Sequence, residues 1–206
     1  MSSGTTTIGL VCKDGVVLAT ERRATMGHFI ANKTAVKLFR IDRMIGATLA
    51  GSIGDAQVLI RYMRAEVALY RMRRGGPVRV ESAATLTANL LNSNRYYPYL
   101  AWLIVGGVDS SGGHVFALDA GGGCIEDRFV SIGSGSPFVY GVLEDAWRES
   151  PTVSDGIDLS LRGLTSAMKR DSASGDGYAV AEITQGGYRE LEPEELRKRL
   201  SRLKLT

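Results

Sequence analysis

The chain has 206 residues, which is long enough for one medium domain with a sizeable hydrophobic core. Its apolar and charged fractions, 44% and 23%, are those of an ordinary globular protein, and a formal net charge of +3 is too small to indicate nucleic-acid binding. No apolar run reaches the length of a membrane span, and nothing near the amino terminus resembles a signal peptide. We therefore expect a cytoplasmic protein that binds neither nucleic acid nor membrane.

The first part of the chain is predicted to contain two strand hairpins. A Lys13-Asp14-Gly15 turn separates two β-branched runs, which is a strong hairpin signal. A polar, less regular segment is expected through Lys33, and a second strand pair then turns around Asp42-Arg43. The predicted strands are residues 5–12, 15–20, 36–41 and 44–50.

Two helices are predicted next, the first from Ser52 to a stop at Gly75-Gly76-Pro77 and the second over residues 82–92. Apolar residues at spacings of four, four and three predict one buried face of the first helix: Leu59, Met63, Val67 and Tyr70. The same helix carries residue types that are enriched at protein interfaces, beside several arginines: Tyr62, Met63, Tyr70 and Met72.

The rest of the chain is predicted to hold three short strands separated by Gly-rich turns, two helices, one more strand and a charged tail helix from Pro193. Thr152 or Ser154 is expected to cap the second of these helices. The predicted strands are residues 102–108, 114–119, 125–130 and 178–184, and the predicted helices are residues 137–148 and 153–170. Strand runs that alternate with helix pairs predict an antiparallel α+β sandwich with helices outside, built as one domain.

The two cysteines, Cys12 and Cys124, form neither a CxxC pair nor a set with metal-ligand spacing. We expect both to be small buried hydrophobic residues in a reducing compartment. The sequence also contains no HExxH motif and no P-loop, so neither a metal nor a cofactor is predicted.

The segment Gly4-Thr5-Thr6-Thr7 carries the first chemical signal. A threonine hydroxyl is a weak nucleophile unless a base lies beside it, and an amino-terminal threonine carries its own base in its α-amine. That amine has an ordinary pKa near ~8, so a modest decrease leaves it neutral at working pH. Cleavage after Gly4 would make Thr5 such a residue. The alternative is an ordinary β-branched strand near a terminus.

Lys37 and Glu21 are candidate partners of that nucleophile. A lysine held near an α-amine lowers the pKa of the amine by repelling its proton. Glu21 ends the second predicted strand, where its carboxylate could pair with Lys37 and fix it. The alternative for these two residues is a surface salt bridge, or no contact at all.

Gly51 ends a predicted strand where a helix begins, so its N–H would lie near a helix N-terminus, which favours negative charge. That position suits an oxyanion hole. The alternative is a glycine that only permits a tight strand-to-helix turn.

Two further segments are rich in small polar residues, Gly133-Ser134-Gly135-Ser136-Pro137 and Arg170-Asp171-Ser172-Ala173-Ser174-Gly175. The first does not fit a dinucleotide-binding G-x-G-x-x-G motif, because Phe138 replaces the third glycine.

Taken together, these motifs resemble archaeal-type β subunits of the 20S proteasome, from Thr5 nearly to the C-terminus. Six motifs in the family's order carry the resemblance: Gly4-Thr5-Thr6-Thr7, Ala19-Thr20-Glu21-Arg22-Arg23, Lys37-Leu38-Phe39 with Ile41-Asp42, Ala50-Gly51-Ser52-Ile53-Gly54-Asp55-Ala56-Gln57, Gly133-Ser134-Gly135-Ser136, and Arg170-Asp171-Ser172-Ala173-Ser174-Gly175. The resemblance implies the four-layer αββα sandwich of the N-terminal-nucleophile hydrolases. It further implies a propeptide, residues 1–4, removed by autocatalytic cleavage between Gly4 and Thr5, and a single catalytic domain over residues 5–206.

The resemblance also implies a role for each site residue. Thr5 is the nucleophile and, through its freed amine, the base; Lys37 and Glu21 are its electrostatic partners. The N–H of Gly51 forms the oxyanion hole. A hydrogen-bond shell surrounds the Thr5 amine, formed by Ser134, Asp171 and Ser174. Glu21 departs from the aspartate of many active relatives, and its longer side chain changes the detailed geometry rather than the role.

By the same resemblance, six residues line the pocket for the substrate side chain before the scissile bond: Ala24, Thr25, Ala35, Phe39, Leu49 and Ile53. None of them is acidic, so we expect chymotrypsin-like cleavage after large hydrophobic residues of unfolded proteins. The implied partners are proteasome α subunits and other β subunits in a stacked-heptamer barrel, with a regulatory ATPase cap. Two alternatives are a non-catalytic ring subunit and the simpler bacterial ATP-dependent threonine peptidase of related fold.

Overall fold

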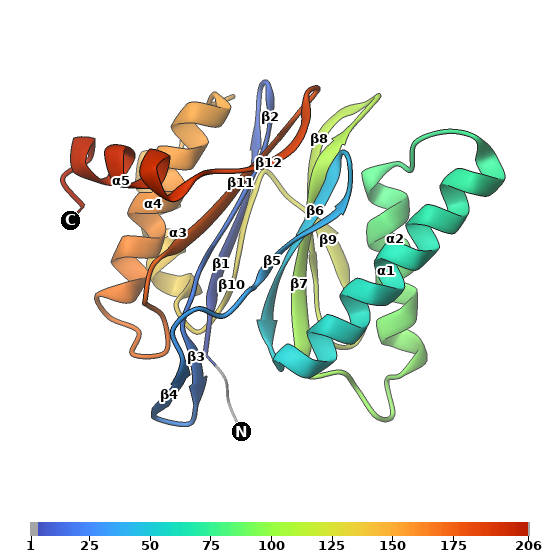
Figure 1. Cartoon of the computed structure of the whole chain (residues 1–206), viewed down its shortest axis with the longest axis horizontal. Helices are drawn as coiled ribbons and strands as arrows, with labels where there is room; N and C mark the ends of the chain where they lie inside the picture. Colours follow the sequence, from blue (N-terminus) through green and yellow to red (C-terminus); the bar gives the residue numbers. More distant parts are fainter. Residues whose placement is uncertain (1–3, 206) are drawn as a thin grey trace.

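The computed structural model describes residues 4–205 and shows two five-stranded antiparallel sheets stacked between two layers of helices (Figure 1). The expected four-layer α+β sandwich is therefore confirmed. The first sheet has the order β10-β1-β2-β11-β12 and the second the order β5-β6-β7-β8-β9.

The first sheet is built around the amino-terminal hairpin, whose strands β1 and β2 pair from Thr7↔Thr20 to Cys12↔Gly15. Helices α3 and α4 pack on its outer face through apolar side chains such as Val139, Ile157 and Leu164, which meet Ile8 and Leu10 of β1. Its strands are β1 (Thr6–Cys12), β2 (Gly15–Glu21), β10 (Phe129–Gly133), β11 (Tyr178–Thr184) and β12 (Gly187–Glu190), and its helices are α3 (Ser136–Ala146), α4 (Val153–Met168) and α5 (Pro193–Arg202).

The second sheet carries helices α1 and α2 on its outer face. Leu59 and Met63 of α1 and Leu91 of α2 pack against Leu49 and Leu103 of the sheet. Its strands are β5 (Leu38–Asp42), β6 (Ile45–Gly51), β7 (Ala101–Asp109), β8 (Gly112–Leu118) and β9 (Cys124–Glu126), and its helices are α1 (Ile53–Arg74) and α2 (Val80–Ser93).

The two sheets pack face to face through a third apolar cluster that includes Leu18, Ile104 and Ile183. Both faces of each sheet are therefore covered, and all seven residues of β2 are buried. Polar contacts also join the two sheets: the Thr48 hydroxyl donates to the Thr7 hydroxyl at 2.9 Å, and the Tyr188 N–H donates to the Arg43 carbonyl at 2.8 Å. A sheet that is covered on both sides explains why the strands read as continuous β-branched runs rather than as alternating patterns.

The helix ends follow the predicted signals. Ser52 caps α1 by accepting a hydrogen bond from the Asp55 N–H at 3.4 Å, and Gly75 ends it in the left-handed region at φ 69°. Thr152 caps α4 in a reciprocal capping box with Asp155. Of the two caps proposed for α4, Thr152 is the one used.

The predicted strand over residues 125–130 is wrong, because the chain changes sheets inside it. Residues 124–126 form β9 in the second sheet, and residues 129–133 form β10 in the first. At the crossing, the Asp127 N–H donates to the Val115 carbonyl at 3.1 Å, and the Arg128 carbonyl accepts from Val11 of the other sheet at 2.8 Å. A continuous apolar run cannot reveal which sheet each half joins.

Three other segments differ from the prediction. The polar stretch before Lys33 contains a short hairpin, β3 (Ala24–Met26) with β4 (Phe29–Asn32), and residues 187–190 form the edge strand β12. The second hairpin turns at residues 43–44, one residue later than expected, because a register irregularity lies between Arg40 and Asp42. The other predicted elements lie within a few residues of the observed ones.

Three predictions about burial are wrong. Cys124 is exposed on the short edge strand β9. Tyr70 is 41% exposed, since the apolar face of α1 ends at Val67. Met63 is 1% exposed, which confirms its predicted place on the buried face of α1, so its second predicted place, on the surface that Tyr62, Tyr70 and Met72 form, is wrong. None of the helices within residues 4–205 is both long and apolar enough to cross a membrane.

Candidate active site

The predicted site residues gather at the end of the sandwich where the chain begins (Figure 1). Antiparallel pairing explains this, because β1 and β11 begin where β2 and β10 end, with Thr6 opposite Gly133 and Tyr178 opposite Glu21. Lys37 directly precedes β5, and Gly51 is the last residue of β6.

Thr5 lies at the centre of this group and is 3% exposed. Its hydroxyl accepts a hydrogen bond from the Lys37 ammonium at 2.9 Å and donates to the Gly4 carbonyl at 2.7 Å. Its backbone N–H donates to the Ser134 hydroxyl at 3.2 Å. The nucleophile predicted from the sequence thus touches both a cation and the carbonyl of the residue before it.

Gly4 lies in a space that is too small for any residue with a Cβ atom. A Cβ at this position would lie 2.1 Å from the Cβ of Ala173 and 2.7 Å from the Ser134 hydroxyl oxygen. The Gly4 N–H donates to the Thr25 hydroxyl at 3.2 Å. The glycine before Thr5 therefore brings its carbonyl against the hydroxyl of Thr5.

Lys37 and Glu21 form a buried ion pair, with side chains 1% and 0% exposed, so the surface salt bridge considered above is ruled out. The Lys37 ammonium also donates to the Arg23 carbonyl. Burial lowers the pKa of Lys37 from its ordinary value, although the Glu21 carboxylate opposes that decrease. Burial raises the pKa of Glu21, with Lys37 again opposing.

Backbone groups complete the coordination of the Glu21 carboxylate. It accepts hydrogen bonds from the N–H groups of Thr6 at 3.3 Å, Arg23 at 2.6 Å and Gly175 at 3.1 Å. The longer glutamate side chain therefore reaches the lysine and is fixed there. The role expected for Glu21 is compatible with this geometry.

Ser134, Asp171 and Ser174 meet on the other side of Thr5. One oxygen of the Asp171 carboxylate, Oδ2, accepts from the Ser134 hydroxyl at 2.6 Å and from the Ser174 hydroxyl at 2.7 Å. Because the Ser134 proton points toward Asp171, its oxygen remains an acceptor for the Thr5 N–H. The structure thus brings these three residues together next to Thr5.

Gly51 requires its glycine for steric reasons. Its φ is +108°, and a Cβ would lie 2.3 Å from the Leu100 carbonyl oxygen. Helix α1 begins two residues later, at Ile53. The position at a strand-to-helix turn agrees with the prediction, while the oxyanion role of the Gly51 N–H stays a prediction.

The six residues predicted to line the substrate pocket are all buried or half-buried, and they come from different parts of the fold. Ala24, Thr25 and Ala35 are buried at 7%, 8% and 9% exposure. Leu49 and Phe39 pack in the cluster beneath α1 and α2, and Ile53 is half-buried at the start of α1.

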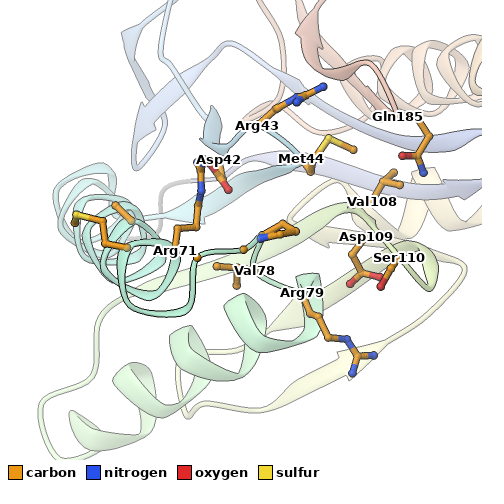
Figure 2. A pocket seen from close by; sticks show the side chains of 15 residues that line it. Asp42, Arg43, Met44, Arg71, Val78, Arg79, Val108, Asp109, Ser110 and Gln185 are labelled. Carbon is orange, nitrogen blue, oxygen red and sulfur yellow. The ribbon is translucent and has the colours of Figure 1, made fainter.

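Two cavities lie away from this end of the molecule. One, of about 950 Å³, lies at the opposite end of the sandwich, and Figure 2 shows the Asp42–Arg71 ion pair on one side of it and Arg79 and Gln185 on the other. A smaller cavity of about 300 Å³ lies beside Trp147. Neither cavity is lined by a predicted site or pocket residue.

Sequence reasoning missed two residues that hold the site together. The Thr6 hydroxyl lies 2.6 Å from the Ser174 hydroxyl. The Arg23 guanidinium binds Asp176 at 2.7 Å and the Ser172 carbonyl at 2.8 Å, which ties the loop after α4 to β2. Both residues lie inside motifs quoted above, but their side-chain directions are not visible in a sequence. Within residues 4–205, no cluster of three or more potential ligands could hold a metal ion.

Comparison with known proteins identifies the family. A family model described as "Proteasome subunit" matches residues 1–183. A protein named proteasome subunit beta from Methanothermobacter thermautotrophicus is 51% identical over 97% of this chain and 96% of its own length. Proteins of the same name from Methanosarcina mazei and Ferroglobus placidus are 52% and 53% identical, over 95% and 98% of this chain and 94% and 96% of their own. The chain therefore belongs to the proteasome subunit family.

Proposed function

We propose that the chain is a catalytic β subunit of the 20S proteasome core particle, a threonine-type endopeptidase that hydrolyses peptide bonds of unfolded proteins in the cytoplasm. The observation that carries this proposal is the 2.9 Å contact between the Lys37 ammonium and the Thr5 hydroxyl inside a fully buried network. A threonine with no role beyond strand formation would not require a buried lysine beside its hydroxyl.

Peptide hydrolysis would use the Thr5 amine that is freed when the Gly4–Thr5 bond is cut. The amine takes the proton of the Thr5 hydroxyl while the oxygen attacks the substrate carbonyl. The Gly51 N–H stabilises the oxyanion, and the leaving amine receives the proton as the ester forms. Water, deprotonated by the same amine, then hydrolyses the ester. Lys37 favours the neutral, basic form of the amine by charge repulsion.

The amino-terminal segment would be removed by the same hydroxyl. Before cleavage the nitrogen of Thr5 is part of the peptide bond, so Lys37 or a water molecule must assist the hydroxyl in place of the amine. Attack on the Gly4 carbonyl breaks the Gly4–Thr5 C–N bond, so the Thr5 nitrogen takes up the proton and becomes the free amine while residues 1–4 remain as an ester on the Thr5 oxygen. Water then hydrolyses the ester, which restores the hydroxyl and releases the segment. The hydrogen bond from the Thr5 hydroxyl to the Gly4 carbonyl supports this route, since it holds the two reacting groups together. Residues 1–3 of the proposed propeptide lie outside the described residues.

Substrate preference should follow the apolar pocket. With no acidic side chain among its six residues, we expect faster hydrolysis of peptides with leucine or tyrosine before the scissile bond than of peptides with arginine. Burial of a large apolar side chain contributes roughly 1.5–3 kcal/mol, which is about ten-fold or more in kcat/KM. Fluorogenic peptides that differ only at this residue measure the ratio, and faster hydrolysis of the arginyl peptide would contradict the pocket assignment.

Activity should require assembly into a particle with α subunits outside and β subunits inside. Helix α1 exposes Tyr62, Tyr70 and Met72 at 51%, 41% and 73%, and such residues are enriched at interfaces. We expect little hydrolysis by monomers and high activity in a large particle, which a regulatory ATPase cap would supply with substrate. Size-exclusion chromatography with a peptide assay on each fraction measures this, and full activity in a monomer-sized peak would contradict it.

The two alternatives are distinguishable in the same preparation. A non-catalytic ring subunit would assemble without hydrolysing peptides, although the presence of Thr5, Lys37 and Asp171 in one site argues against it. A bacterial-type threonine peptidase would form rings of six rather than seven subunits, which electron microscopy counts directly.

A further inference from the structure

Thr6, the residue after the proposed nucleophile, is completely buried and its side chain belongs to the site network. Its hydroxyl oxygen lies 2.6 Å from that of Ser174. The Ser174 proton is used in the bond to Asp171, so the Thr6 hydroxyl is the donor in this contact. A chain of bonds therefore runs from Thr6 through Ser174 to the Asp171 carboxylate, which holds Ser134 against the nitrogen of Thr5.

The backbone of Thr6 is fixed at both ends. Its N–H donates to the Glu21 carboxylate at 3.3 Å, and its carbonyl accepts from the Thr20 hydroxyl at 3.2 Å. The polar groups of Thr6 thus contact both the Glu21–Lys37 pair and the Ser174–Asp171 pair.

The space around the Thr6 hydroxyl is closed by Gly135, the residue before α3. A Cβ at position 135 would lie 2.1 Å from the hydroxyl oxygen of Thr6 and 3.3 Å from Asp171 Oδ2. This close approach confines the hydroxyl to the direction of Ser174.

We propose that Thr6 is a positioning residue for catalysis. Its hydroxyl orients Ser174 and Asp171, and through Ser134 it holds the Thr5 amine in the direction needed for proton transfer. Hydrogen bonds in such a chain polarise one another, so the Thr6 donor also disperses the negative charge that Asp171 presents toward the amine. This inference rests on the proposed peptidase function, because only in that function does the Thr5 amine act as the base.

The test compares Thr6→Ser with Thr6→Ala in particles assembled with α subunits. Both variants lose the methyl group, and only Thr6→Ala loses the hydroxyl. We expect Thr6→Ser to stay within about three-fold of wild type, and Thr6→Ala to be slower by a further factor of roughly ten, the worth of one net hydrogen bond. The loss should be in kcat rather than KM, because substrate contacts are unchanged.

The pH profile provides a readout that a merely structural role would not change. Without the Thr6 donor, more of the negative charge on Asp171 favours the protonated Thr5 amine. The acid limb of kcat/KM in Thr6→Ala should therefore move to higher pH by roughly half a unit. Thr6→Cys, which replaces the hydroxyl by a weaker donor, should move the limb in the same direction and serves if Thr6→Ala does not assemble.

Thr48 is the matched control, since its hydroxyl is equally buried and donates to Thr7 rather than to the site. Thr48→Ala should lower the melting temperature yet keep the wild-type pH profile. If Thr6→Ala and Thr6→Ser have equal kcat and equal pH profiles, the inference is wrong. If the wild-type particle itself does not hydrolyse peptides, the proposed function has failed instead.

Discussion

Replacing Thr5 with alanine is expected to abolish peptide hydrolysis and to leave residues 1–4 attached to the protein. Both effects have one cause, since the same hydroxyl attacks the substrate and the Gly4 carbonyl. Loss of a catalytic nucleophile lowers kcat by a factor on the order of 10⁴ or more. Peptide hydrolysis by assembled Thr5→Ala particles and the intact mass of the chain measure the two effects.

Thr5→Ser is the matched control, because serine keeps the hydroxyl and the potential amine. This variant should be processed and should retain part of the activity. Recovery of Thr5→Ala protein that already begins at residue 5 would show that another protease removes the segment. Hydrolysis by Thr5→Ala at the wild-type rate would remove Thr5 from the mechanism altogether.

Lys37→Ala is expected to remove nearly all activity as well. Its kcat should fall by a factor of roughly 10² to 10³, which is typical of losing one electrostatic contact to a transition state. Without the cation the Thr5 amine is more readily protonated, so the remaining activity should have an acid limb shifted to higher pH. The kinetics of processed Lys37→Ala particles across pH measure both changes. A wild-type rate and an unshifted profile would contradict the role of Lys37.

Lys37→Ala should also lower the stability of the fold, and this effect must be measured separately from the loss of catalysis. Glu21 is completely buried, and removal of one partner of a buried ion pair costs about 3–5 kcal/mol. The double variant Lys37→Met with Glu21→Gln removes both charges, so it should regain much of the lost stability without regaining activity. Thermal unfolding and peptide hydrolysis of the two variants distinguish the contributions.

Much of the fold could be predicted because its strands and helices have local signals. The Lys13-Asp14 turn, the Ser52 cap and the Gly75 stop are each determined by residues within a few positions. The change of sheet at Asp127 and Arg128 could not be predicted in this way. It depends on a contact with Val115 in the preceding strand and on one with Val11, which lies near the amino terminus.

The candidate site shows the same limit. Motifs identified Thr5, Lys37 and Asp171, whereas spacing alone left the Lys37–Glu21 pair open to interpretation as a surface salt bridge. Burial decides that question, and burial is a property of the packed sheets. The role inferred for Thr6 depends on a side-chain direction, which the run of three threonines does not specify.

The central claim is that Thr5 becomes an amino-terminal nucleophile. The most direct test is the intact mass of the wild-type chain from the active particle, measured beside the chain from unassembled monomer. We predict that the chain in the particle begins at Thr5 and that the chain in the monomer still carries residues 1–4. A fully active particle whose chain keeps the Gly4–Thr5 bond would contradict the claim, because the nitrogen of Thr5 could then not act as the base.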